Sequence, residues 1–202
     1  MRYRSPTVVL ALSLFASAAP MMCLAQESSR PPLERPDARV LLLPMAMYNE
    51  QANLLEVTDT VKAFIASDVL QNKLGELLGA QLVDSAAASR VLALPAVLAI
   101  TGGKPCNVIV ACARAAAREA GALWVVMGKV SKTSNLIWLF TGQLIHVGTG
   151  DIILDDSTEL KGDPDNMVRV GSRIFAERVV RAIRLGGVAT NYPDPSGPPP
   201  TR

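Results

Sequence analysis

The sequence predicts an α/β (α+β) fold, in which helices pack on a mixed sheet of about five strands that ends in an antiparallel meander. Two continuous apolar runs, residues 39–44 and 123–127, are typical of strands covered on both faces. Helical segments lie between these runs, and such connections place helices against the faces of a sheet. Near the C-terminus, apolar and polar residues alternate after the turn at 148–150, which predicts the meander.

The order of the elements follows from their boundary signals. In chain order we expect a strand at 39–44, a helix from about 58 to 78, a short strand at 81–84, a helix at 107–121, strands at 123–127, 136–146 and 152–160, and a helix from 163 to about 185. Gly79 and Gly121 are end signals for the first two helices, and Asp163 before Pro164 is a start signal for the last. The polar sequence Lys-Thr-Ser-Asn at 132–135 separates two of the strands.

The first helix carries apolar residues on two nearly opposite faces. One face has Val57, Val61, Phe64 and Ile65, and the other has Leu70, Leu74, Leu77 and Leu78. A helix with a single apolar stripe buries only that stripe. We therefore expect this helix to be bent near residues 67–68 or buried on two sides.

The N-terminus has the features of a secretory signal peptide, which we assign to residues 1–25. Two arginines precede an apolar stretch at 7–19 that is short for a transmembrane helix, and a small-x-Ala cleavage site ends at Ala25. Cys23 is not expected to carry a lipid anchor, because Pro-Met-Met at 20–22 replaces the small residues that lipidation needs. The predicted location is the periplasm.

The mature chain divides into a flexible leader at 26–38, a single α/β domain at 39–185 and a disordered Pro/Gly-rich tail at 186–202. The whole chain has 20 basic and 18 acidic side chains, and two of the arginines lie in the predicted signal peptide. The mature chain is therefore close to neutral, which argues against electrostatic binding of nucleic acid or anionic lipid. It has no further apolar segment long enough for a membrane span.

Two cysteines remain after cleavage, Cys106 and Cys112. In an oxidising compartment an even pair first predicts a disulfide. A spacing of six on a continuous helix would put the sulfurs on different turns, so a bridge requires Cys106 to precede the helix. Free buried thiols and a metal site remain as alternatives, although His146 is the only histidine and a zinc site would need carboxylates as well.

The segment AREAGALWVVMGKVSKTSNLIWLFTGQLIHVGTGDII resembles the central signature of a bacterial family of exported proteins of unknown function. Its motif is Gly-x-Val-x-Lys-x-Ser-Asn-Leu-Ile, at residues 128–137. That family in turn looks like the amino-terminal domain of TolB and the CsgG and LpoB group of envelope proteins, which carry helices on a mixed sheet. The resemblance covers residues 39–183 and implies an envelope accessory or binding protein with no established activity.

The polar turn supplies the first candidate site, with Lys129, Lys132, Ser134 and Asn135 as ligand- or partner-binding residues. A Ser beside a Lys can act as a nucleophile with its base, but only if the Lys is desolvated. A turn between strands is normally exposed, and Asn and Ser satisfy local backbone groups there. Forming the bend is therefore the first interpretation of these residues, and contact with a peptide or small ligand is the second.

The second candidate is a cation site at Asp163 and Asp165, which together with Asn166 offer three oxygen donors in a short loop. The loop lacks the central Gly and the final Glu of an EF-hand. Asp163 also fits the N-terminal anion of the last helix. His146 alternates with apolar residues along its strand, which favours a partly buried structural role.

No phosphate-binding loop, dinucleotide fingerprint, nucleophile elbow or zinc-helix motif is found in the sequence. We therefore expect neither enzymatic activity nor a cofactor, and ionisable groups that stay in solvent. The predicted function is that of a periplasmic accessory protein, which binds another envelope protein through an exposed sheet edge or an apolar patch. The alternative is a carrier of a small ligand or cation, with its pocket between residues 95–106 and the meander.

Overall fold

The computed structural model describes residues 38–49, 56–103, 106, 108–134 and 137–187. All of them lie in one of the two compact units of the chain, Pro31–Arg202. The predicted signal peptide, with Cys23, lies outside the described residues. So do the predicted leader except Ala38 and the predicted tail except Gly186 and Gly187.

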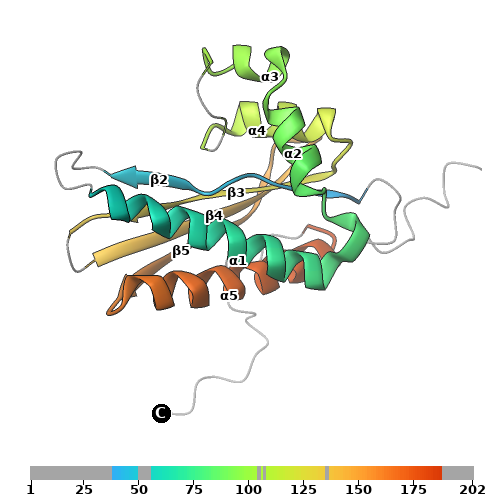
Figure 1. Cartoon of the computed structure of the whole chain (residues 1–202). Coiled ribbons are helices and arrows are strands. Elements are labelled where there is room, and N and C mark those ends of the chain that lie inside the picture. The colour runs from blue at the N-terminus through green and yellow to red at the C-terminus, as the bar shows by residue number, and fades with distance from the viewer. Residues whose placement is uncertain (1–37, 50–55, 104–105, 107, 135–136, 188–202) are drawn as a thin grey trace, which may run out of the picture. The chain divides into compact units, whose positions relative to one another are not determined.

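The sheet has five strands in mixed orientation. They are β1 (Val40–Leu42), β2 (Ala46–Asn49), β3 (Trp124–Lys132), β4 (Ile137–His146) and β5 (Ile152–Lys161). Both β1 and β2 pair with β3 in parallel, and β3, β4 and β5 form an antiparallel meander. In Figure 1, β1 and β2 follow one another along the same side of β3. The predicted fold class is confirmed.

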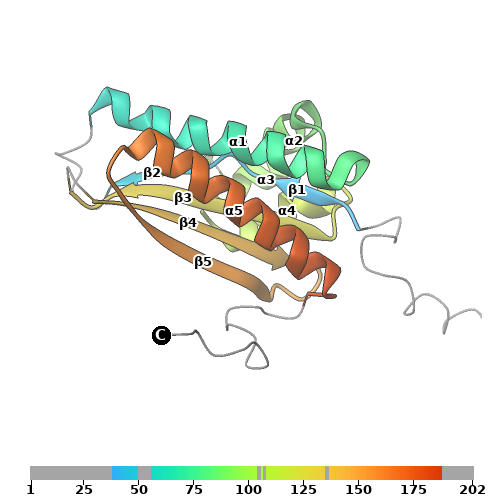
Figure 2. The ribbon, with the colours of Figure 1, turned by 90° about the horizontal axis from the view of Figure 1, so that it is seen from below.

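Helices lie on both faces of the sheet. One face is covered by α1 (Thr60–Leu78) and α5 (Pro164–Arg184), which lie side by side in Figure 2. On the opposite face, α2 (Ser85–Leu92), α3 (Pro95–Ala99) and α4 (Val110–Glu119) gather beside β1 and β3. The far part of that face, over β4 and β5, exposes polar side chains such as Asp155 and Ser157.

Each face of the sheet has its own core, because successive strand residues point to opposite faces. Val126 packs with Leu70, Leu74 and Phe175 of the first helix layer. The neighbouring Val125 packs in the second core, with the alanines and Cys112 of α4. Because both faces of β3 are buried, its sequence at residues 124–127 is continuously apolar.

The first helix is buried on one side only, so burial on two sides, one of the two predicted alternatives, is wrong. Its buried residues are Ala63, Ala66, Leu70, Leu74 and Leu78. Val57 is 90% exposed and Phe64 is 72% exposed, on the side that we expected to be covered. The alanines give the first half of α1 a buried stripe without large side chains, which the apolar pattern did not reveal.

Other elements also differ from the prediction, and the short helices α2 and α3 were not predicted. Residues 81–84 are not a strand, since Gln81 ends a short 3-10 turn (Gly79–Gln81, η5) and Leu82 forms only an isolated bridge with Val40. The strand β2 was not predicted, because the first strand was expected to end at Pro44. Pro44 is exposed between β1 and β2 at the sheet edge, where the missing N–H of a proline is tolerated. No helix in the described part of the chain is both long and apolar enough to cross a membrane.

Candidate functional site

The polar residues of the predicted turn do not converge in one place. Lys129 and Lys132 are part of β3, and their odd spacing puts their side chains on opposite faces of the sheet. The Ser134 hydroxyl accepts a hydrogen bond from the N–H of Ile137 at 3.1 Å, which is a turn role. Asn135 lies outside the described residues. The side chains of the described members therefore form no common binding site.

Lys132 is buried rather than exposed, which corrects the prediction for this residue. Its Nζ donates to Oδ2 of Asp59 at 2.8 Å, and the side chains of Lys132 and Asp59 are 5% and 7% exposed. Asp59 ends a short 3-10 turn (Val57–Asp59, η4) at the start of α1. The pair therefore joins the beginning of α1 to the end of β3.

The pKa of Asp59 is lowered in the folded protein. Burial alone would raise this pKa, but the hydrogen bond from Lys132, the backbone N–H of Glu56 and the charges of Lys132 and Lys62 favour the carboxylate more strongly. The Glu56 N–H lies 2.9 Å from Oδ2 of Asp59. The expectation that all ionisable groups stay in solvent is wrong for this pair.

The Lys132–Asp59 pair is positioned for a structural role. The Lys132 ammonium lies 5.5 Å from the ring centroid of Trp138, and the Lys62 ammonium lies 5.9 Å from the same ring. Trp138 is 3% exposed. A carboxylate and an aromatic ring both interact favourably with a buried cation. The Lys132 ammonium is therefore fixed by Asp59 and Trp138 and is not available to bind a ligand.

Lys129 lies on the opposite face of the sheet, where its side chain is partly exposed. Its Nζ is 4.6 Å from the ring centroid of Tyr48, and Tyr48 is 46% exposed. This is a surface cation–aromatic pair of modest strength.

The two aspartates of the predicted cation site have separate structural partners. Asp163 is the N-cap of α5, and its Oδ1 accepts the N–H of Asp165 at 3.2 Å. The Asp165 carboxylate forms an ion pair with Lys62 at 3.1 Å. Within the described ranges, no group of three or more His, Cys, Asp or Glu side chains could hold a metal ion. The geometry therefore gives no support to a cation site there.

His146 has the structural position that its strand pattern predicts. Its ring packs edge-on against Trp124, with a centroid distance of 5.0 Å. Its Nδ1 lies 2.9 Å from Oγ1 of Thr149 and accepts the Thr149 N–H at 3.2 Å. These contacts fix the turn between β4 and β5.

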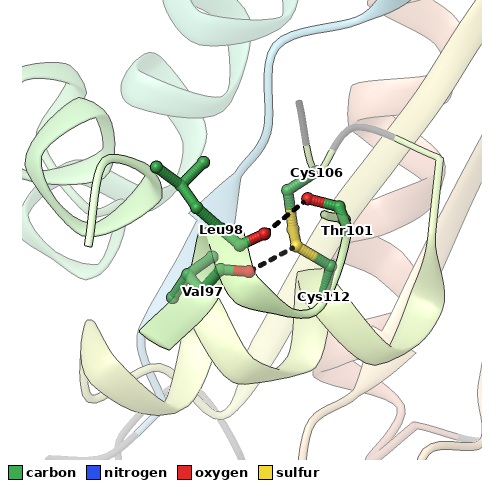
Figure 3. Close-up of a disulfide and its surroundings, with 5 residues drawn as sticks. All are labelled: Val97, Leu98, Thr101, Cys106 and Cys112. Atoms are coloured by element: carbon green, nitrogen blue, oxygen red, sulfur yellow. Dashed lines mark hydrogen bonds between the residues drawn. A yellow bond between two sulfur atoms is a disulfide. The ribbon is translucent and has the colours of Figure 1, made fainter. Parts of the chain in front are cut away.

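Cys106 and Cys112 are joined by a disulfide, with their Cα atoms 5.4 Å apart (Figure 3). Cys106 lies before α4 and Cys112 within it, which is the arrangement that the spacing requires. Sγ of Cys112 also lies 3.6 Å from the carbonyl oxygen of Val97 in α3. The bridge thus connects the segment before α4 to α4 itself, next to the end of α3.

Beside the disulfide the molecule is hollowed by two apolar cavities that share Pro44, Ser89 and Leu92. The larger, of about 460 Å³, is also lined by Ala93, Leu98, Gly103 and Cys106. The smaller, of about 240 Å³, is also lined by Leu42, Leu43, Ser67, Asp68, Gln71, Ser85 and Ala88. We call the two together the edge groove. It is the candidate functional site, because large apolar hollows with a few polar groups are typical of binding sites.

The floor of the edge groove is the outer edge of β1. The N–H of Leu43 donates to the carbonyl of Val126 at 2.9 Å, so Leu43 faces β3. In a parallel strand, alternate residues direct their backbone groups to opposite edges, which places those of Leu42 on the outer edge. On that edge the carbonyl of Val40 accepts the N–H of Val83 at 2.9 Å. Within the described residues the outward groups of Leu42 have no such partner.

Sequence reasoning did not find the edge groove. Its walls come from α1 and α2, and its floor from the junction between β1 and β2, so its members are distant in the sequence. The available signal was Pro44, because a proline between two apolar segments is typical of an edge strand. The ligand pocket predicted between residues 95–106 and the meander differs in one wall. Leu98, Gly103 and Cys106 line the larger cavity, but none of its described lining residues belongs to the meander.

Comparisons with known proteins bear mainly on the fold. Residues 90–179 match the model of a family described as a protein of unknown function (DUF2380). No curated protein matches the chain in sequence. Among solved structures, the C-terminal domain of LpoB from Salmonella enterica is 22% identical, with a TM-score of 0.44 over 62% of this chain and 84% of that one.

Two other solved structures show a similar degree of likeness. The lipoprotein GNA1162 from Neisseria meningitidis is 13% identical, with a TM-score of 0.45 over 72% of this chain and 96% of that one. TolB from Acinetobacter baumannii is 14% identical, with a TM-score of 0.42 over 74% of this chain and 29% of that one.

Proposed function

We propose that the chain is an exported accessory protein of the bacterial envelope, which acts by binding another protein at the edge groove. One observation carries this proposal. The two apolar cavities lie beside the outer edge of β1, where the backbone groups of Leu42 have no partner among the described residues. Apolar hollows supply binding energy through burial, and a free strand edge supplies directional hydrogen bonds.

The periplasmic location rests on two features of the chain. The sequence of residues 1–25 has the three parts of a secretory signal peptide. The Cys106–Cys112 disulfide suits an oxidising compartment, where such bridges form and persist. Both features support a partner that is itself in the envelope.

The proposal includes no catalytic step. Two residues with acid–base side chains, Lys132 and His146, have structural partners, which are Asp59 and Thr149. The walls of the edge groove offer amide and carboxylate groups from Gln71 and Asp68. Such groups are suited to orienting a bound chain.

Site-specific photo-crosslinking in the periplasm tests the proposal. A photoreactive phenylalanine analogue at Ser89, in the groove, is expected to link the chain to one discrete envelope protein. The same analogue at Ser157, an exposed residue of β5, is the matched control and is expected to give no such adduct. The proposal fails if Ser89 yields no adduct, or if both positions yield the same one.

A small-ligand carrier is the second candidate, and the size of the larger cavity favours it. A volume of about 460 Å³ falls within the roughly 300–1,000 Å³ of small-molecule sites. Native mass spectrometry of protein purified from periplasm separates the two functions, because a carrier retains a small molecule of fixed mass. The Ser89→Trp variant, which fills the groove, would lose that molecule.

A further inference from the structure

We infer that the edge groove takes an extended segment of its partner as an added β-strand beside β1, with apolar side chains directed to α2 and polar or basic side chains directed to α1. This inference rests on the proposed function, and it names the conformation and side-chain pattern of the bound segment. Strand addition is a general mode of peptide recognition, in which main-chain hydrogen bonds give affinity and side-chain pockets give specificity.

The hydrogen bonds along the outer edge of the sheet define where a strand can be added. Val83 already occupies the edge beside Val40. Further along, the N–H of Met45 is taken by Oγ of Ser67 at 2.8 Å. Leu42 lies between these two points. Its outward N–H and C=O have no backbone partner among the described residues, so they are the groups with which a strand of the partner would pair.

The chain itself leaves room beside Leu42, because it turns away from the edge after Val83. Asp84 ends the extended stretch as the N-cap of α2, and its Oδ2 accepts the N–H groups of Ala86 at 3.0 Å and Ala87 at 3.1 Å. An incoming strand therefore continues the line of Leu82 and Val83, where the chain has left the sheet.

The two walls of the groove differ in chemistry. The wall from α1 presents Ser67, Asp68 and Gln71, and the wall from α2 presents apolar Ala88 and Leu92 beside Ser85 and Ser89. Successive side chains of a strand point to opposite faces, so one set meets α1 and the alternate set meets α2. The larger cavity then receives an apolar side chain next to Leu92 and Leu98.

Charge complementarity specifies the polar set. Asp68 is exposed, and among the lining residues that the structure describes it is the one that carries a charge. A lysine or arginine of the bound segment that faces α1 would pair with this carboxylate. The bound segment is therefore expected to alternate apolar residues with polar ones and to carry a basic residue in the polar set.

The other edge of the sheet is less suited to strand addition. The outermost strand β5 exposes Asp155, Ser157 and Glu159 on its solvent face, without a helix on that side. Charged residues along an edge strand are a common protection against pairing with another chain. The groove edge has an apolar wall from α2 and α3 instead, which favours it as the docking edge.

Selection from a displayed library of random twelve-residue peptides on the folded, oxidised protein tests the inference. The expected consensus alternates apolar and polar residues with at least one Lys or Arg. Ser89→Trp is expected to lower the affinity for the selected peptides at least tenfold, whereas the matched Ser157→Trp is expected to leave that affinity unchanged. Asp68→Asn is expected to lower the affinity for peptides with a basic residue by a few-fold.

Backbone methylation of a selected peptide tests the strand itself. Single N-methyl groups are expected to weaken binding roughly tenfold or more at alternate positions only, because alternate amides of an added strand face β1. Hydrogen exchange of the Leu42 amide is expected to slow by at least tenfold in the complex. Failure to select any peptide, equal binding by Ser89→Trp, or indifference to methylation at every position would each overturn the inference.

The outcome for the inference can be separated from that for the proposed function. If Ser89 crosslinks an envelope protein but the peptides bind without alternate methylation sensitivity, the partner docks in the groove in another conformation and only the strand inference falls. If no envelope protein is crosslinked while peptides still bind as strands, the proposed role as an envelope accessory protein is rejected. The edge groove would then still be a site for strand addition.

Discussion

Nζ of Lys132 lies 2.8 Å from Oδ2 of Asp59, across 73 residues of sequence, and both side chains are almost fully buried. The contact fastens the start of α1 to the last residue of β3. Taking two charges out of water is costly, so such a pair is stable only while both members are present. It provides the first two tests of the structure.

Lys132→Met is expected to destabilise the protein by about 3–5 kcal/mol, because it leaves the Asp59 carboxylate buried without its partner. Urea unfolding measures this change. Lys129→Met is the matched control, since Lys129 is partly exposed on the opposite face, and it is expected to cost less than about 1 kcal/mol. Adding Asp59→Asn to Lys132→Met should restore part of the loss. Equal effects of the two lysine variants would contradict the buried pair.

The same pair gives the stability of the protein a defined dependence on pH. The folded pKa of Asp59 is lower than its ordinary value of 3.8, so this group contributes stability that is complete above that value. The contribution is lost as the pH falls from about 3.8 through the lower pKa of the folded protein. The free energy of unfolding should therefore fall less steeply with acid in Asp59→Asn than in the wild type. If the free energy of unfolding had the same pH dependence in both proteins, the neighbours of Asp59 could not be lowering its pKa.

The parts of the fold with marked boundaries could be predicted from the sequence. The last helix begins after its N-cap Asp163 and ends before Leu185, within one residue of the prediction. The strand β3 was predicted at its apolar half but continues to Lys132. The extension could not be recognised, because a buried lysine looks like a surface residue until its distant partner is known.

The sequence predicted the kind of surface at the candidate site but not its location. The sequence indicated an exposed sheet edge or an apolar patch, and the edge groove combines both. Its location depends on how α2 packs against β1 and α1, and no helix was predicted at the residues of α2. Ser89 and Leu92 have no local sequence signal, because they were recognised as candidates only from the hollow that they line with Pro44.

Removal of the disulfide is expected to destabilise the protein by about 2 kcal/mol, because it frees a loop of only six residues in the unfolded chain. The measurement is urea unfolding of Cys106→Ser with Cys112→Ser against the wild type. Alkylation of the unreduced, exported protein followed by mass spectrometry checks the bridge directly. Two labelled thiols in that experiment would contradict it.

Paired glycines at the centre of the sheet provide a test of its packing. Gly128 and Gly142 are opposite each other on β3 and β4, and a methyl group on Gly142 would lie 2.5 Å from Cζ of Phe175. Gly142→Ala must displace that ring and is expected to cost about 1–3 kcal/mol in urea unfolding. Gly128→Ala should cost more, because its methyl group would meet the backbone oxygen of Thr141, which cannot rotate away.

Gly75→Ala is the matched control for these substitutions. Gly75 lies inside α1, and a methyl group there would have no atom within 4 Å. The change is therefore expected to stabilise the protein by about 0.5–1 kcal/mol through the higher helix propensity of alanine. If Gly142→Ala were as stable as Gly75→Ala, Phe175 could not be packed against the glycine pair, and the placement of α5 on the sheet would be incorrect.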